Sequence, residues 1–355
     1  MLEGRLRRLG FKGEHMKSYQ EVIQYLAKAK REKHLLIGNG FSISYNPSIF
    51  SYNALSKYVE SAKDEDLKKL FEAVKNKNFE LLMQQLANTK NIVTALGGDA
   101  KLVKKIDAAS SKLKQSLIDA VSSLHPEHVF KIPAATSKKC SEYLNEFLSK
   151  DGKIFSTNYD LLLYWVLMRN EIPNAIDGFG RDVIDQGHPV PEDQVELSEL
   201  RWGNNRETQN IFYVHGALQL FDDGIEIVKE EYDGNFILDN IKTRMDKGQY
   251  PIFVTAGNGN EKLNHILHNH YLSDCYDKLC QVKGSLITFG FNFGEYDEHI
   301  IRAINEAASQ GIEDQLRSIY IGVYSKSDEK HIESIKGKFK CKVNTYDSKT
   351  VNIWN

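Results

Sequence analysis

Length, composition and charge describe an ordinary globular chain. The protein has 355 residues, of which 41% are hydrophobic and 26% are charged, so it is long enough to bury a full core in one or two domains. The formal net charge of -2 excludes an overall positive field that would attract nucleic acid, and no direct nucleic-acid binding is expected. No apolar run is long enough to span a bilayer, so we expect a soluble, cytoplasmic protein without membrane association.

The cysteines and the first residues bear on the cellular compartment. Residues 1–15 are basic but lack the apolar core of a secretory signal, so we interpret them as an extension upstream of a domain that spans residues 16–355. Cysteines are too few for a disulfide scaffold and none forms a CxxC pair, which favours reduced thiols in the cytosol. The four are Cys140, Cys275, Cys280 and Cys341.

The chain begins with a predicted helix and strand. Residues 19–31 have a helical pattern, and the compact apolar run 34–37 breaks at a glycine turn, as a strand entering a turn does. From about residue 52 to residue 150 the chain is rich in Lys, Glu, Leu and Ala, with apolar residues three or four apart. This spacing predicts amphipathic helices, which we interpret as a helical insertion into the fold.

Strand signals return after the insertion. Several of the runs are continuously apolar and helical patterns lie between some of them, which predicts a largely parallel sheet with helices on both faces. The predicted fold class is therefore α/β with a Rossmann-like, mainly parallel sheet. Residues 177–210 are polar and contain several glycines, and we expect a loop that could cover a site. The apolar runs are residues 153–156, 211–214, 252–254, 285–289 and 318–321.

The first candidate motif is a glycine turn after the first core strand. The segment Gly38-Asn39-Gly40-Phe41-Ser42 places two glycines where the backbone of a dinucleotide-binding fold approaches a diphosphate. A tight strand-to-helix turn also uses glycines, and the third glycine of the dinucleotide fingerprint is missing. The motif alone therefore leaves nucleotide binding and a structural turn both open.

The second motif follows the next core strand. In Ser156-Thr157-Asn158-Tyr159-Asp160, the Asn158 carboxamide at a strand end has the chemistry to orient a water molecule or a ribose hydroxyl. Asp160 is placed to accept free N–H groups of the apolar helix that follows. For Thr157 and Asp160, a helix-capping role and a functional role are equally compatible with the sequence.

The third motif is a histidine at a strand end. In Tyr213-Val214-His215-Gly216 the imidazole stands at the carboxyl end of an apolar run, where open α/β sheets bind ligands, and its ordinary pKa suits a general base. A single histidine is more often structural, so the neighbouring motifs decide its interpretation. Three further histidines between residues 265 and 270 have no carboxylate or cysteine at a convincing spacing, and no metal site is predicted.

The fourth motif is another strand followed by a glycine turn. Gly290 and Asn292 follow the run 285–289, and Asp297 precedes a predicted helix that begins near Glu298. A polar side chain after such a turn could contact an adenosine or ribose, and Asp297 could cap the helix. A plain strand-turn-helix junction explains the same residues.

The order of the four motifs resembles the sirtuin family of NAD-consuming enzymes. The resemblance covers roughly residues 34–330 without most of the helical insertion. It is closer to the bacterial sirtuin-like NAD hydrolases of anti-phage defence systems, which also carry a helical insertion and often a helix of the type Phe79-Glu80-Leu81-Leu82. Two departures from the deacylases support the narrower resemblance: the paired CxxC motifs of their zinc module are absent, and Tyr45-Asn46-Pro47-Ser48-Ile49-Phe50 replaces their Gly-Ile-Pro-Asp-Phe-Arg segment.

The resemblance implies NAD as substrate, without a metal, and a role for each motif. The turn from Gly38 to Ser42 would hold the diphosphate, whereas Gly290, Asn292 and Asp297 would shape the adenosine side of the pocket. Thr157 and Asp160 would complete the cofactor-binding set. Asn158 would orient the nicotinamide ribose and the attacking water, and His215 would act as general base in cleavage to nicotinamide and ADP-ribose.

Regulation and other functions are also implied. A free NAD hydrolase would deplete the cell of NAD, so a homo-oligomer or a partner that controls activity is expected. The resemblance suggests a HerA-type ATPase, an Argonaute-like protein or a nucleotide-sensing subunit. The alternatives are a non-catalytic module that binds NAD or ADP-ribose, an NAD-dependent deacylase or ADP-ribosyltransferase, and a purely structural α/β protein.

Overall fold

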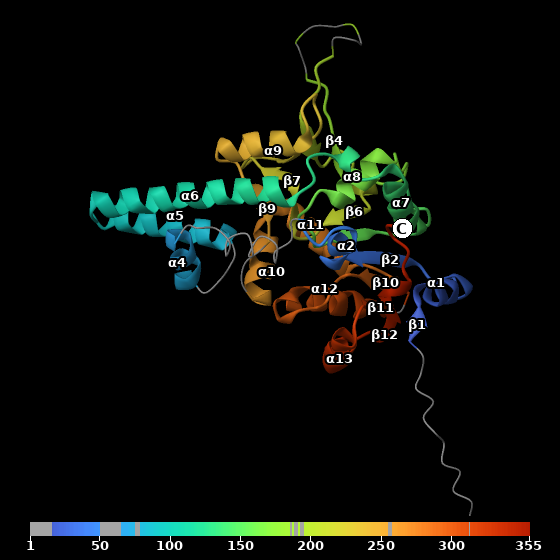
Figure 1. Ribbon diagram of the computed structural model, residues 1–355. Coiled ribbons are helices and arrows are strands. Elements are labelled where there is room, and N and C mark those ends of the chain that lie inside the picture. The colour runs from blue at the N-terminus through green and yellow to red at the C-terminus, as the bar shows by residue number, and fades with distance from the viewer. Residues whose placement is uncertain are drawn as a thin grey trace, which may run out of the picture.

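The computed structural model (Figure 1) describes most of the chain, and its N-terminal extension is outside the described residues. Residues 52–64 of the predicted insertion are also outside them. The described residues are 16–49, 65–74, 79–184, 187, 191, 195–254, 258–311 and 313–355.

Seven strands in the described part of the chain form one parallel sheet, in the order β1-β12-β11-β10-β2-β3-β6. All five residues of β2 are buried, as expected for a strand covered on both faces. The strands are β1 (Lys17–Ser18), β2 (Lys33–Ile37), β3 (Ile154–Ser156), β6 (Ile211–Tyr213), β10 (Gly284–Phe289), β11 (Leu316–Val323) and β12 (Lys342–Asp347).

The strand order is that of a doubly wound nucleotide-binding fold. When β2 is counted as the first strand, the order from β6 to β12 reads 3-2-1-4-5-6, and the edge strand β1 is added beside β12. The chain moves outward in one direction through β3 and β6 and then returns to the other side of β2 through β10. The order therefore reverses between β2 and β10, which is where such folds form their ligand crevice. The predicted α/β, Rossmann-like fold class is confirmed.

Helices flank this sheet. Helix α7 contacts β2 and β3, α11 contacts β6, and α12 and α13 contact β11. The short helix α2 follows β2 directly and carries the second half of the first glycine motif. The helices around the sheet are α1 (Tyr19–Lys28), α2 (Gly40–Tyr45), α7 (Ala134–Leu148), α8 (Leu162–Arg169), α10 (Gly259–His268), α11 (His270–Cys280), α12 (Glu298–Ala308) and α13 (Lys326–Ile335).

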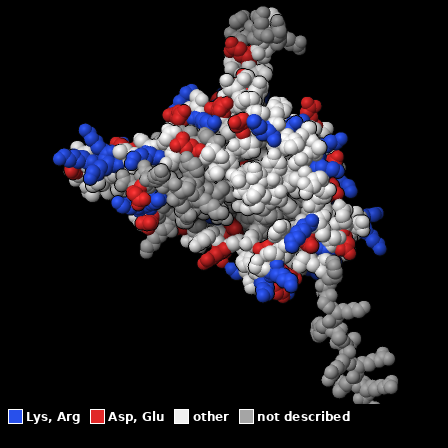
Figure 2. Space-filling model, in the orientation of Figure 1, with Lys and Arg blue, Asp and Glu red and all other residues white. Residues whose placement is uncertain are grey.

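The inserted region contains helices, and three of them project from the sheet as an arm (Figure 1). They are α4 (Glu65–Val74), α5 (Phe79–Ala95) and α6 (Ala100–Leu124). Leu82, Leu86, Ile106 and Leu113 are buried, which accounts for the helical spacing of apolar residues in this region. Figure 2 shows Lys and Arg side chains gathered at the outer end of the arm, whereas both signs of charge are mixed over the rest of the visible face.

A second, antiparallel sheet was not predicted. Its order is β4-β5-β8-β7-β9, so the run 252–254 belongs to this sheet, and the expectation of a place in the parallel sheet was wrong. Gly216, with a φ of 78°, turns the chain immediately after His215 and allows β7 to begin there. The predicted loop 177–210 contributes two short strands. The sheet comprises β4 (Phe179–Gly180), β5 (Leu200–Trp202), β7 (Gly216–Asp222), β8 (Ile227–Lys229) and β9 (Pro251–Phe253), and α9 (Ile237–Asp246) lies between β8 and β9. Among the described helices, none has the length and apolar character needed to cross a membrane.

Candidate functional site

The four predicted motifs meet at one edge of the parallel sheet. They follow β10, β2, β3 and β6, which are consecutive neighbours in the sheet. Register pairs Ile37 with Phe289 on one side and with Ser156 on the other, and Ser156 in turn with Tyr213. Because these strands are parallel and end at the same level, their four turns lie side by side at the carboxyl edge.

The two glycine turns pack directly against each other. The Gly40 N–H donates to the Gly290 carbonyl at 2.8 Å, and a Cβ at Gly40 would lie 2.5 Å from the Gly290 Cα. Gly290 has a φ of 67°, a conformation that favours glycine. Close approach of the two turns therefore accounts for these glycines even without a ligand.

Most backbone donors in the first turn already have a partner. The N–H groups of Gly38, Gly40 and Phe41 donate to the carbonyls of Phe289, Gly290 and Gly38, respectively. The predicted diphosphate contact therefore has to come from other groups of this turn. Asn39 is half-buried and lines an adjoining cavity, so its side chain is such a group.

Ser42, Asp160 and Asn158 form a buried polar cluster. The Ser42 hydroxyl donates to Asp160 Oδ2 at 2.5 Å, and Asn158 Nδ2 donates to Ser42 Oγ at 3.0 Å. Ser42, Asn158 and Asp160 are all buried. The Asn158 Oδ1 atom is also buried and has no hydrogen-bond partner within the described protein. Since an unpaired buried acceptor is costly, this oxygen is a position for a ligand hydroxyl or a water molecule.

The ionisation state of Asp160 decides which groups donate and which accept in the hydrogen bonds of this cluster. Burial raises the pKa of Asp160 to about 6, and its hydrogen bonds from Ser42 and from the Leu162 N–H act in the opposite direction. Above this pKa the carboxylate can only accept hydrogen bonds. The Ser42 hydroxyl must then donate to Asp160, so its oxygen accepts from the Asn158 amide and Asn158 Oδ1 points elsewhere.

Two of the cofactor-binding candidates also have local structural roles. The Leu162 N–H donates to Asp160 Oδ1 at 2.9 Å, so Asp160 satisfies a free donor at the start of α8. The Thr157 N–H and hydroxyl both donate to the Ile37 carbonyl, at 3.1 and 3.2 Å. Thr157 thus ties the turn after β3 to the end of β2.

His215 forms a pair with a second histidine. Its Nε2 atom lies 2.7 Å from Nε2 of His299, and the ring centroids are 5.0 Å apart. Tyr159 also stacks on His215, with the two ring centroids 6.4 Å apart. Burial, the adjacent His299 and Lys262 hold the pKa of His215 well below its ordinary value. Burial and the cations Lys262 and Arg302 lower the pKa of His299 to about 3, so both rings are neutral at physiological pH.

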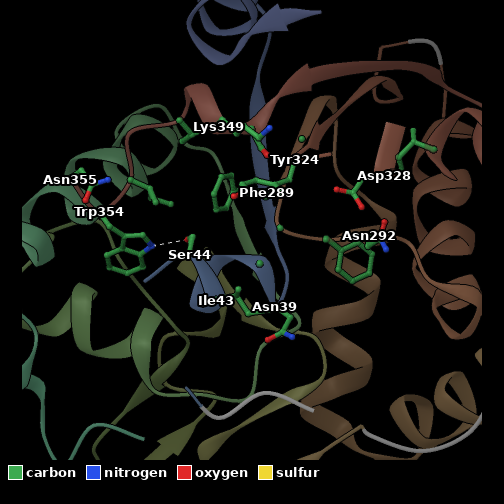
Figure 3. A pocket seen from close by; sticks show the side chains of 18 residues that line it. Asn39, Ile43, Ser44, Phe289, Asn292, Tyr324, Asp328, Lys349, Trp354 and Asn355 are labelled. Atoms are coloured by element: carbon green, nitrogen blue, oxygen red, sulfur yellow. Dashed lines mark hydrogen bonds between the residues drawn. The ribbon is translucent and has the colours of Figure 1, made fainter. Parts of the chain in front are cut away.

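A large cavity lies beside α2 (Figure 3). It measures about 840 Å³ and is bounded by the ends of β10 and β11, by α2 and by residues near position 350. Four predicted cofactor-binding residues line it: Asn39, Gly40, Gly290 and Asn292. In α2, Ile43 and Ser44 face the cavity, whereas Ser42 is buried against Asp160.

The remaining candidates lie outside the cavity wall. Phe41 is buried and packs on Trp354, with ring centroids 5.0 Å apart. The expectation that Asp297 caps α12 was wrong, because its side chain makes no capping bond to that helix. Asp297 instead accepts the Gly294 N–H at 3.1 Å, which closes the turn before the helix, and forms an ion pair with Lys262 at 3.3 Å.

Several site residues were not predicted. His299 lies at the start of α12, and its only signal in the sequence is a position shortly after the fourth motif. Tyr324, Asp328, Lys349 and Trp354 line the cavity. Tyr324 and Asp328 follow β11 in the same way that the recognised motifs follow their strands, and this position could have identified them. In the described residues, no group of three His, Cys, Asp or Glu side chains is arranged to hold a metal ion.

Comparison with models of protein families assigns the chain to a family. The model of a domain of unknown function, DUF4917, matches residues 35–354, which include all four motifs and the cavity wall up to Trp354. The chain belongs to the DUF4917 family. No curated protein matches the chain. The DUF4917 match begins in β2 and spans the helical arm, the antiparallel sheet and the parallel sheet except for β1, which precedes the match together with α1.

Proposed function

We propose that this protein is an NAD hydrolase of the sirtuin-like type, which cleaves the nicotinamide–ribose bond. The observation that carries the proposal is the pairing of Asn158, whose buried Oδ1 has no partner within the described protein, with the neutral His215 at the ends of adjacent strands. Both lie at the carboxyl edge of a Rossmann-like sheet, the edge at which dinucleotides bind, on the side of the reversal point that carries β3 and β6.

The shape of the edge suits a ligand with two halves. The cavity lies over β10 and β11, and the polar cluster lies over β2 and β3, with α2 between them. NAD would place its adenosine in the cavity and its nicotinamide ribose beside Asn158. Tyr324, 69% exposed, offers a ring face on which adenine could stack, and Asn292 and Asp328 offer polar groups for the ribose.

Asn158 has the role of positioning the ribose. Because its Nδ2 is held by Ser42, its Oδ1 is fixed as an acceptor for a ribose hydroxyl or for the attacking water. Holding a reactant in place in this way converts a bimolecular step into an effectively unimolecular one.

His215 has the role of general base. The bond between C1′ of the ribose and N1 of nicotinamide breaks, and the electron pair leaves with nicotinamide. The oxygen of water forms the new bond to C1′, and its proton passes to His215 and then to solvent. The products are ADP-ribose, nicotinamide and one proton. A neutral imidazole is the form that accepts this proton, and a buried site excludes competing bulk water.

Control of such an activity is part of the proposal. Unregulated hydrolysis would exhaust cellular NAD, so we propose that activity depends on self-assembly or on a partner protein, as in antiviral defence systems. The ATPase, Argonaute-like and nucleotide-sensing partners implied by the resemblance remain candidates. The helical arm, with exposed Ile92 and Leu96 near its end, offers surface for such a contact.

The test is release of nicotinamide from NAD, followed by chromatography at high and low protein concentration, with and without the product of the neighbouring gene. We expect His215→Ala and Asn158→Ala each to lower the rate by about 100- to 10,000-fold. His268→Ala, which changes an exposed histidine of α10, is the matched control and should leave the rate unchanged. Wild-type rates in both site variants would refute the assignment. Binding of NAD without release under every condition would identify a binding module instead.

A further inference from the structure

His299 is a buried histidine beside the proposed general base, and the mechanism above gives it no task. We infer that His299 is a positioning residue that fixes the tautomer of His215: Nε2 of His215 carries the proton, and its Nδ1 is left as the base. This inference rests on the proposed role of His215 in NAD hydrolysis.

The contact itself requires one shared proton. The two Nε2 atoms are 2.7 Å apart, and His215 and His299 are only 4% and 1% exposed. Two facing N–H groups would repel each other, and two facing lone pairs would also repel each other. A contact of this length is therefore a hydrogen bond in which one ring donates and the other accepts.

The proposed role of His215 decides which ring accepts. Its Nε2 atom is occupied by the contact with His299, so Nδ1 is the ring nitrogen of His215 left to take a proton from water. A neutral imidazole that uses Nδ1 as the base carries its single proton on Nε2. His215 therefore donates from Nε2, and His299 accepts at Nε2 and carries its own proton on Nδ1.

Hydrogen bonds from neighbouring segments fix the backbone of both histidines. The His215 carbonyl accepts the Val254 N–H at 2.9 Å, and the His299 carbonyl accepts the Tyr276 hydroxyl at 2.9 Å. The backbone of the pair is thus anchored by the residue after β9 and by α11. A histidine whose tautomer is already set needs less reorganisation when a substrate binds.

Nearby cations keep the pair neutral. Lys262 of α10 and Arg302 of α12 both disfavour protonation of His299. Each cation has its own partner: Lys262 pairs with Asp297 at 3.3 Å, and Arg302 donates to Asn260 Oδ1 at 2.9 Å. Since neither ring of the resting protein holds a second proton near neutral pH, the one-proton hydrogen bond is in place when the substrate binds.

The experiment is to determine the tautomer of His215 by nitrogen-15 NMR of the full chain labelled at histidine, at neutral pH. His215→Asn identifies the signal. His299→Phe keeps a ring but removes the acceptor, His299→Gln keeps an acceptor oxygen, and His268→Phe makes the same change at an exposed site in α10. The same preparations are assayed for nicotinamide release.

We expect a single Nε2–H tautomer of His215 in the wild type and in His268→Phe, and a mixture of tautomers in His299→Phe. We expect kcat to fall by about tenfold or more in His299→Phe, with a smaller change in KM, and to recover in part in His299→Gln. A proton on Nδ1 of His215 in the wild type would overturn the inference, as would an unchanged tautomer and kcat in His299→Phe. The wild-type spectrum decides the point even if His299→Phe does not fold. An absence of nicotinamide release with the expected tautomer would count against the proposed function alone.

Discussion

Replacement of Asp160 by asparagine tests the buried polar cluster most directly. Asp160 is 2% exposed and accepts hydrogen bonds from Ser42 and from the Leu162 N–H. Its pKa is raised by burial from 3.8 to about 6. The Asp160→Asn variant has nearly the same volume but cannot ionise, so it separates the charge of this residue from its packing.

The raised pKa makes the ionised carboxylate a cost to stability. In the unfolded chain Asp160 loses its proton near its ordinary value, whereas in the folded protein it keeps the proton up to about pH 6. Stability therefore falls as pH rises through this window, by about 3 kcal/mol in total. The variant avoids that cost, but its amide reverses the hydrogen bond with Ser42 and replaces a charged acceptor by a neutral one, at a cost of about 1 kcal/mol. We expect Asp160→Asn to be more stable by about 2 kcal/mol near pH 8, and the advantage to vanish towards about pH 4.

Activity should change in the opposite direction. The side-chain amide that Asp160→Asn introduces would direct an N–H at the Ser42 hydroxyl, which would then have to accept instead of donate. The hydroxyl proton would then meet Nδ2 of Asn158, which lies 3.0 Å from the Ser42 oxygen, so the Asn158 amide would have to turn over and present Oδ1 to Ser42. Because that oxygen would no longer be free for the substrate, we expect nicotinamide release to fall by about 100-fold or more.

Urea unfolding at the two pH values gives the free energy of unfolding, and the same samples give the rate of nicotinamide release. Asp246→Asn, which changes an exposed aspartate of α9, is the matched control and should alter neither quantity. A stability difference between wild type and Asp160→Asn that does not depend on pH would refute the assigned pKa. Full activity in the variant would refute the argument that Asp160 orients Asn158 through Ser42.

Three other substitutions and one control test the turn after His215 and the cavity. Gly216→Ala would place a Cβ 1.9 Å from a β9 carbonyl and should prevent stable folding, whereas Gly224→Ala, also at positive φ but with open space around it, should cost about 1 to 2 kcal/mol in thermal unfolding. Trp354→Phe removes the indole N–H that donates to Ser44 at 2.9 Å and should raise KM for NAD about fivefold without changing kcat. Tyr324→Ala should raise KM by about 5- to 100-fold through loss of base stacking, and an unchanged KM would place adenine elsewhere.

The sequence was sufficient to predict the five strands of the parallel sheet from β11 to β6, because these are short apolar runs separated by helical patterns, whereas β1 and β12 at its other edge were not predicted. Burial on both faces makes such strands continuously apolar, and β2 is fully buried along its length. The meeting of the four motifs could also be predicted, because parallel strands bring their carboxyl ends to one edge of the sheet. The run 252–254 has the same appearance, and its pairing with β7 depends on the turn at Gly216, which local composition does not reveal.

Contacts between distant segments could not be predicted. His215 and His299 are 84 positions apart in the chain and meet only because α12 follows the strand beside β2. Trp354 likewise comes from the other end of the chain, and its indole N–H contacts Phe41 and Ser44. The capping alternative for Asp297 was wrong because an aspartate before a helix is often an N-cap, whereas an ion pair with Lys262 and a hydrogen bond from the Gly294 N–H hold this side chain.

The fold explains some of the motif residues and leaves others unexplained, and the difference bears on function. Gly40 and Gly290 are required for two turns to touch, and Thr157 ties two strand ends together, so these residues would be present without any ligand. The packing of the turns and strand ends does not require Asn158 or His215. A buried amide oxygen without a partner costs stability, and a hydrophobic pair would fill the space of two histidines without a desolvation cost. Under the proposed function, the bound NAD and the attacking water supply the compensating interactions, because they offer a hydroxyl to Asn158 and a proton to His215.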